Sequence, residues 1–85
     1  MKNEVRIALE QHLVDVVING KAPTHLVTAV RLPTGAVEIA VNTENLDEKL
    51  HYIARSYDDE MRLKTSPFVR MIDIMVIFHE SDEND

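Results

Sequence analysis

The segment that decides the fold is FVRMIDIMVIFHE, residues 68–80, a long β-rich run near the C-terminus. Counting by twos gives one face with Phe68, Arg70, Ile72, Ile74, Val76 and Phe78, and an opposite face with Val69, Met71, Asp73, Met75, Ile77 and His79. Both faces are mostly apolar. An antiparallel sheet with one solvated face would give the strand one polar set, so we expect both faces to be covered.

Two earlier runs predict a β-hairpin. They are THLVTAVRL (24–32) and AVEIAVN (36–42), and the PTG between them has turn chemistry, because proline presets φ and Gly35 tolerates positive φ. Alternation places Leu26, Thr28, Val30 and Leu32 on one face of the first strand, and Val37, Ile39 and Val41 on one face of the second. We expect these two sets to meet the helices.

The second face of the predicted sheet is small, mixed and apolar, with charges at its rim. It suits a sheet-to-sheet contact with another copy of the chain. The predicted oligomer interface comprises Val27, Ala29, Arg31, Glu38, Ala40, Met71, Asp73, Met75 and Ile77. The alternative is that one helix covers each face of the sheet, which would leave no open face.

A first helix is predicted from Asn3 to about Ile18. Apolar residues recur at steps of three and four (Val5, Leu9, Leu13, Val16), and Asn19-Gly20 provides a C-terminal stop. Asn-Gly is also a hairpin signal, and LVDVVI is β-branched, so a strand over 13–18 is the competing interpretation.

A second helix is predicted after Asn45, which forms a capping-box pattern with Glu48. Its apolar stripe is Leu46, Leu50, Ile53, Tyr57 and Met61, with acid-before-base pairs Asp58–Arg62 and Glu60–Lys64 four residues apart. We expect Thr65-Ser66-Pro67 to end the helix, because Pro67 lacks an amide proton.

The elements together predict a single α+β domain over residues 1–79. The order is helix-strand-strand-helix-strand, with a three-stranded antiparallel sheet packed with two helices. Residues 80–85 form an acidic tail that we expect to be disordered.

Composition limits the classes of partner. The 85 residues include no cysteine, and the formal net charge is −6. Four acids lie in the tail, which leaves nine basic against eleven acidic residues elsewhere, a balance of −2. A nearly balanced body gives no long-range attraction to phosphate, so we expect no direct nucleic-acid binding. The apolar runs are too short to span a membrane, and we expect a cytoplasmic protein.

No catalytic or metal-binding pattern stands out. The four histidines (His12, His25, His51, His79) lack ligand spacing, and two glycines cannot form a phosphate loop, so we expect no metal and no cofactor. The acids Asp58, Asp59 and Glu60 would diverge on a helix, and we interpret them as a partner-binding acidic face. The alternative is a small metal-dependent enzyme whose site, with His25, His79 and Asp73, assembles between chains.

Most of the chain resembles small uncharacterised proteins encoded by phages and prophages of Gram-positive bacteria. The resemblance runs from GKAPTHLVTAVRLPTGAVEIAVNT through YDDEMRLKTSPFVRMIDIMVI, and its most recognisable parts are LPTGA and YDDEM-x-LK. It implies an intracellular accessory protein of an infected or lysogenic cell, and no activity. Our functional hypothesis is a non-enzymatic protein, a homodimer or other homo-oligomer, that binds a host or phage protein. A minor structural virion component is a further alternative.

Overall fold

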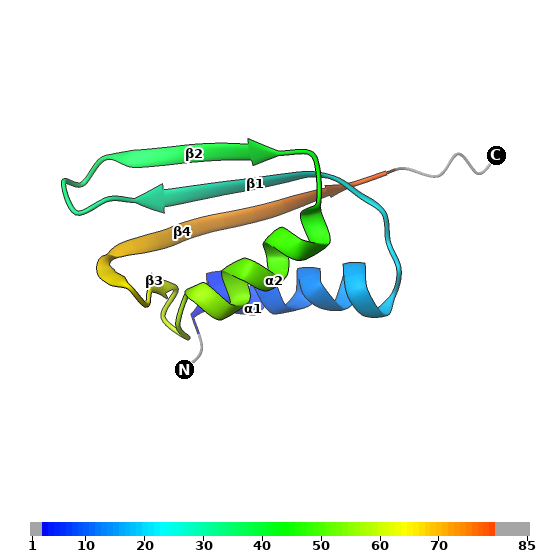
Figure 1. Cartoon of the computed structure of the whole chain (residues 1–85), viewed down its shortest axis with the longest axis horizontal. Coiled ribbons are helices and arrows are strands. Elements are labelled where there is room, and N and C mark those ends of the chain that lie inside the picture. Colours follow the sequence, from blue (N-terminus) through cyan, green and yellow to red (C-terminus); the bar gives the residue numbers. More distant parts are fainter. Residues whose placement is uncertain (1–2, 80–85) are drawn as a thin grey trace.

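The computed structural model describes residues 3–79 as an α+β fold with two helices and a four-stranded antiparallel sheet (Figure 1). The prediction of an α+β class is confirmed, and the prediction of three strands is wrong by one short strand. The elements are α1 (Glu4–Leu13), a π-helical turn (Val14–Ile18), β1 (Pro23–Arg31), β2 (Val37–Asn42), α2 (Leu46–Ser56), β3 (Arg62–Leu63) and β4 (Ser66–Phe78).

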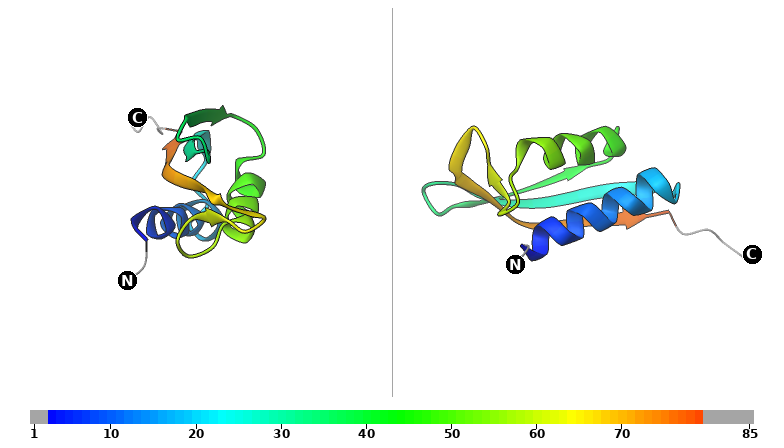
Figure 2. Two further views of the ribbon diagram at one scale, coloured as in Figure 1. Left: turned by 90° about the vertical axis from the view of Figure 1, so that its left-hand side faces the viewer. Right: turned by 90° about the horizontal axis from the view of Figure 1, so that it is seen from below.

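The strand order in the sheet is β2-β1-β4-β3, so the long strands β1 and β4 lie at its centre. Both helices pack on the same face, α1 against β4 and α2 against β1 (Figures 1 and 2). The alternative of one helix on each face is therefore wrong. The opposite face of the sheet carries no helix within residues 3–79.

The hairpin turn sets which residues of β2 face the helices. Leu32 donates its amide proton to Ala36 O at 2.8 Å, and Gly35, with φ of 93°, donates to Leu32 O at 2.8 Å. Three turn residues therefore place Leu32 opposite Ala36, and the register continues as Arg31↔Val37 and Ala29↔Ile39. Residues opposite one another in antiparallel strands share a face.

This register corrects the predicted face of β2. Leu26, Thr28 and Val30 point to the helices, as expected, but their partners on β2 are Asn42, Ala40 and Glu38. The apolar set Val37, Ile39 and Val41 lies on the helix-free face. Glu38 and Ala40, predicted for the oligomer interface, lie on the other face.

A β-bulge in β4 corrects the placement of Met71. Ala29 pairs with Asp73, but the next residue of β1, Val30, pairs with Met71, so Ile72 is an extra residue in β4. One extra residue reverses the alternation on one side of a bulge. Met71 consequently points to the helices and is 3% exposed, although simple alternation predicts it on the interface.

The first helix forms as predicted, including its C-terminal part. The Asn3 side chain accepts hydrogen bonds from the amides of Val5 (2.7 Å) and Arg6 (3.2 Å), which satisfies two of the free amides at the start of the helix. Residues 14–18 form a π-helical turn and not a strand, and Gly20 follows with φ of 69°. The Asn-Gly pair therefore acts as a helix stop.

The second helix ends at Ser56, which is earlier than predicted. Tyr57 is extended, Met61 has φ of 61°, and the segment folds back so that Leu63 pairs with Tyr57 and Arg62 with Arg70. The predicted capping box is also absent, because Asn45 is in the left-handed region and its side chain makes no capping hydrogen bond.

Asp58 explains the early helix end. Its carboxylate accepts hydrogen bonds from the amides of Glu60 and Arg62, both at 2.9 Å, and such local bonds compete with a helix. The predicted Asp58–Arg62 ion pair forms at 3.3 Å, but across this turn. The Glu60–Lys64 pair is not on a helix.

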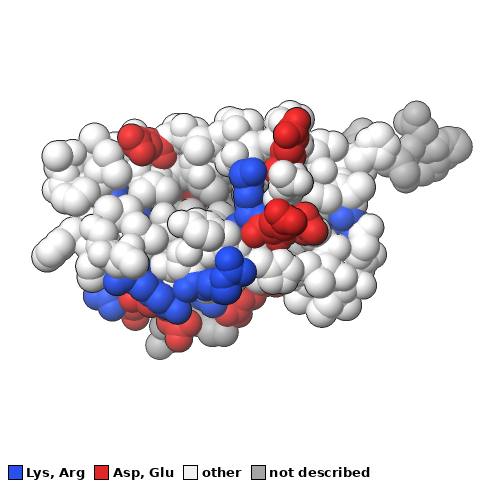
Figure 3. Space-filling model, viewed as in Figure 1, with Lys and Arg blue, Asp and Glu red and all other residues white. Residues whose placement is uncertain are grey.

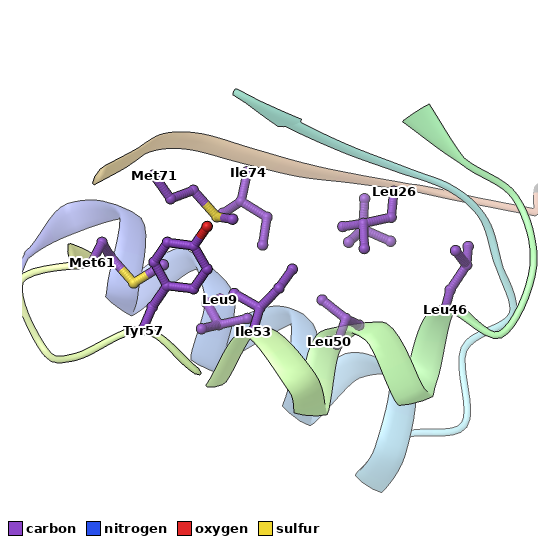
Figure 4. Packing of buried hydrophobic residues seen from close by; sticks show 10 residues of the cluster. Leu9, Leu26, Leu46, Leu50, Ile53, Tyr57, Met61, Met71 and Ile74 are labelled. Atoms are coloured by element: carbon purple, nitrogen blue, oxygen red, sulfur yellow. The ribbon is translucent and has the colours of Figure 1, made fainter. Parts of the chain in front are cut away.

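The core lies between the two helices and the inner face of the sheet (Figure 4). Leu9 of α1, Leu26 of β1, Leu50 of α2 and Met61 of the turn after α2 are fully buried. Burying a leucine-sized side chain stabilises a fold by about 1.5–3 kcal/mol. The predicted stripe of α2 is thus in the core, and Tyr57 and Met61 reach it from outside the helix.

Candidate interaction surface on the open face of the sheet

The helix-free face of the sheet, which we call the open face, presents an apolar patch. Its centre is lined by the side chains of Val27 and Ala29 on β1, Val37, Ile39 and Val41 on β2, and Met75 and Ile77 on β4. Among them Ile39 is 70% exposed, and Val37, Val41, Met75 and Ile77 are exposed as well. Monomeric proteins rarely leave contiguous apolar patches larger than a few hundred Å² uncovered.

Charged groups lie around this patch, at one end above all. Arg31 and Arg70 are opposite one another on β1 and β4. Asp73, which is opposite Ala29, is the next residue of β4 on the same face. His25, opposite Ile77, lies near the other end. An apolar centre with a polar rim is the usual composition of a protein–protein contact.

The structure brings together six of the nine residues predicted for the oligomer interface. Val27, Ala29, Arg31, Asp73, Met75 and Ile77 lie on the open face, whereas Glu38, Ala40 and Met71 lie on the helix side. Sequence reasoning missed the three apolar residues of β2. The turn contains the signal that identifies them, because three loop residues with glycine last fix Leu32 opposite Ala36.

The predicted acidic face is only partly available to a partner. Asp58 is engaged by the two backbone amides and by Arg62, and these hydrogen bonds lower the pKa of its carboxyl group. Asp59 is largely exposed and lies 3.9 Å from Arg6 Nε, while Glu60 is exposed. On the helix side of the molecule, acidic and basic side chains are interspersed over α2 and the segment after it (Figure 3).

The alternative site of His25, Asp73 and His79 is not assembled within one chain. All three lie on or beside the open face, but His25 is opposite Ile77, four residues from Asp73 along β4. Four residues of strand span roughly 13 Å, which is too far for a shared metal. Over residues 3–79, no group of three histidine, aspartate or glutamate side chains could hold a metal ion.

His12 is the one histidine that packs toward the core. Burial lowers its pKa, against the opposing effects of the Ile74 backbone and of Asp15. Its Nδ1 atom is buried without a hydrogen-bond partner in the described part of the chain. This environment favours the neutral ring, which suits a structural histidine beside the exposed edge of β4.

No family model, no curated protein and no solved structure matches the chain. Within residues 3–79, neither helix has the length and apolar composition needed to cross a membrane.

Proposed function

We propose that this is a non-enzymatic protein that acts through protein–protein contact, and that its open face pairs with the open face of a second copy. The observation that supports this most is the placement of both helices on one side of the sheet, which leaves Val37, Ile39, Val41, Met75 and Ile77 exposed on the other. A self-complementary face of this kind produces a two-fold symmetric dimer.

Charge selects the orientation of the two sheets. If the strands of both copies ran in the same direction, the Arg31–Arg70 pair of one copy would lie over the same pair of the other. An antiparallel arrangement separates the two arginine pairs and places each over the end of the partner's sheet where His25 pairs with Ile77. We therefore propose antiparallel stacking, with the sheets about 10 Å apart.

The size of the face predicts a reversible dimer. Three strands about 4.8 Å apart and roughly 30 Å long give a contact well below the ~800 Å² per partner of stable complexes. We expect a dissociation constant on the order of micromolar, so that monomer and dimer exchange.

The cellular role that we propose is that of an accessory protein in the cytoplasm of an infected or lysogenic bacterium. It rests on the sequence resemblance to phage and prophage proteins. In this role the protein binds a host or phage protein through exposed groups. These include the carboxylates of Asp59 and Glu60, which, unlike that of Asp58, accept no backbone hydrogen bond in the turn after α2.

The dimer is tested by light scattering on matched variants. Ile39→Glu places a charge in the patch, whereas Ile18→Glu makes the same change at a residue 75% exposed beyond α1. We expect the wild type and Ile18→Glu to show a mass near twice 9.7 kDa at high concentration, and Ile39→Glu to stay monomeric. A wild-type monomer at all concentrations would refute the proposal.

The absence of cysteine allows a test of which surface is used. Val27→Cys lies in the middle of the patch, and Tyr52→Cys lies on the exposed side of α2. We expect a short bismaleimide to link two copies of Val27→Cys and to leave Tyr52→Cys monomeric. The reverse result would place the contact on the helix side.

A further inference from the structure

A cavity lies between α2 and the inner face of the sheet, on the opposite side of the sheet from the open face. Because α2 packs under β1, the edge strand β2 extends beyond it, and a space of about 240 Å³ remains. Its lining residues are Leu26, Thr28, Val30, Asn42, Lys49, Tyr52, Ile53, Tyr57 and Met71. Sites for drug-sized ligands measure roughly 300–1,000 Å³, so this cavity suits a smaller molecule.

Two side chains of the cavity wall carry hydroxyl groups that the protein leaves unpaired. Thr28 is 7% exposed and Tyr57 is 8% exposed, and no hydrogen bond within residues 3–79 involves either hydroxyl. Neither oxygen is fully enclosed, because the buried and unpaired side-chain atom of these residues is His12 Nδ1. The Tyr57 hydroxyl is directed toward Met71 and Ile74 of the sheet (Figure 4). Water that enters the cavity can reach both hydroxyls, and a polar ligand group can take the place of that water.

Lys49 supplies the charge of the cavity. It is the only charged residue among those that line it, and its ammonium group donates a hydrogen bond to Glu44 O at 3.1 Å. The described residues provide no acidic partner within ion-pair distance of Lys49. A ligand with a negative charge would therefore meet a cation that the protein has not neutralised.

The rest of the wall is apolar. Leu26 and Val30 come from β1, Ile53 from α2 and Met71 from β4. Such a wall binds a short hydrocarbon or aromatic body by removing it from water.

We propose that this cavity binds a small amphiphilic carboxylate, a molecule with a short apolar body and one carboxylate group. The carboxylate pairs with Lys49 and accepts hydrogen bonds from the Thr28 and Tyr57 hydroxyls, and the apolar body lies against Leu26, Ile53 and Met71. The cavity is separate from the open face, so the proposal does not depend on dimer formation.

The probe for the test is hexanoate, with hexan-1-ol as the matched molecule that lacks the charge. Titration of the full chain is followed by amide chemical shifts in NMR, which suits an affinity of about 1 mM or tighter. We expect saturable shifts centred on Thr28, Asn42 and Ile53, and binding of hexan-1-ol weaker by about tenfold. Absence of saturable shifts, or equal affinities for the two molecules, would overturn the proposal.

Variants that keep the shape of the cavity test each contact. Lys49→Met should abolish the preference for hexanoate over hexan-1-ol, whereas Lys64→Met, outside the cavity, should keep it. Thr28→Val with Tyr57→Phe should weaken hexanoate binding severalfold and leave the fold intact, because the removed hydroxyls have no partners in the protein. Unchanged binding in both cavity variants would contradict the assignment. Ile39→Glu should still bind, which separates this result from that of the dimer test.

Discussion

At the scale of the residue, two threonines of β1, Thr24 and Thr28, differ in the hydrogen bonding of their hydroxyl groups. The Thr24 hydroxyl donates to Ile77 O at 3.1 Å, whereas the hydroxyl of Thr28, a residue that is 7% exposed, makes no hydrogen bond within residues 3–79. A hydroxyl that forms a hydrogen bond on folding contributes to stability, and one that forms none contributes no such bond. The Thr28 hydroxyl therefore remains available to the ligand that we propose.

This difference predicts the effect of two matched substitutions. Thr28→Val should raise the free energy of unfolding by about 1 kcal/mol, because a methyl group replaces an unpaired hydroxyl. Thr24→Val should lower it by about 1 kcal/mol, because Ile77 O loses its donor. Urea unfolding monitored by circular dichroism measures both changes. A loss of stability in Thr28→Val would mean that the hydroxyl is satisfied in the folded chain.

His12 predicts how stability depends on pH. Burial lowers the pKa of the folded imidazole below its usual value near 6.5, so the unfolded chain binds a proton more readily. The stability that the folded chain gains from keeping His12 neutral is present in full above pH ~6.5. It is lost as the pH falls toward the lower pKa of the folded state. We expect His12→Gln to show a smaller decrease in unfolding free energy between about pH 7 and pH 5 than the wild type. Equal decreases in the two proteins would exclude His12 as the cause.

At the scale of the element, the β1–β2 hairpin depends on one glycine. Gly35 has φ of 93°, a value that side chains disfavour even though a Cβ there would meet no atom within 4 Å. Gly35→Ala should lower the free energy of unfolding by about 1–2 kcal/mol through backbone strain alone. Gly35→Asn should lose less, because asparagine tolerates the left-handed region better. Thermal unfolding of the two variants measures the difference, and equal losses would contradict a purely conformational cause.

Local patterns in the sequence predicted most of the elements. The helix stripe of Val5, Leu9, Leu13 and Val16 and the turn at Pro33–Gly35 depend on neighbours within a few residues, and both predictions are confirmed. The predicted end of α2 was wrong, because the spacing of the apolar residues Tyr57 and Met61 also fits a longer helix. The helix stops earlier because the Asp58 carboxylate accepts hydrogen bonds from the backbone amides that follow it.

Long-range pairing was less accessible from the sequence. Alternation identified both faces of β4 as apolar, but the assignment of Met71 required the bulge at Ile72, which appears only when β4 pairs with β1. The cavity beside Lys49 was not predicted for a similar reason, because it arises from the position of α2 under β1. Asp73, Met75 and Ile77 lie on the open face as predicted, because alternation holds along β4 on the C-terminal side of the bulge. Glu38 and Ala40 were misplaced for another reason, because the hairpin turn sets the register of β2.

At the scale of the whole molecule, two helices on one side and an apolar patch on the other predict a concentration-dependent stability. A dimer that forms only from folded chains stabilises them by mass action. The melting temperature of the wild type should rise by about 3–5 °C for each tenfold increase in concentration above the dissociation constant. Scanning calorimetry at several concentrations checks this, and Ile39→Glu should melt at one temperature throughout.

The bulge at Ile72 lets β4 lose one residue at this position without changing its faces. If Ile72 were deleted, the pairs Ala29↔Asp73, Val30↔Met71 and Arg31↔Arg70 would follow one another directly, and every residue would keep its side. The Arg70 guanidinium would stay on the open face, and the Met71 thioether would stay in the core. A single missing codon at this point would therefore only straighten the strand, while the same loss at Ile74, in the regular part of β4, would move neighbouring residues to the wrong face.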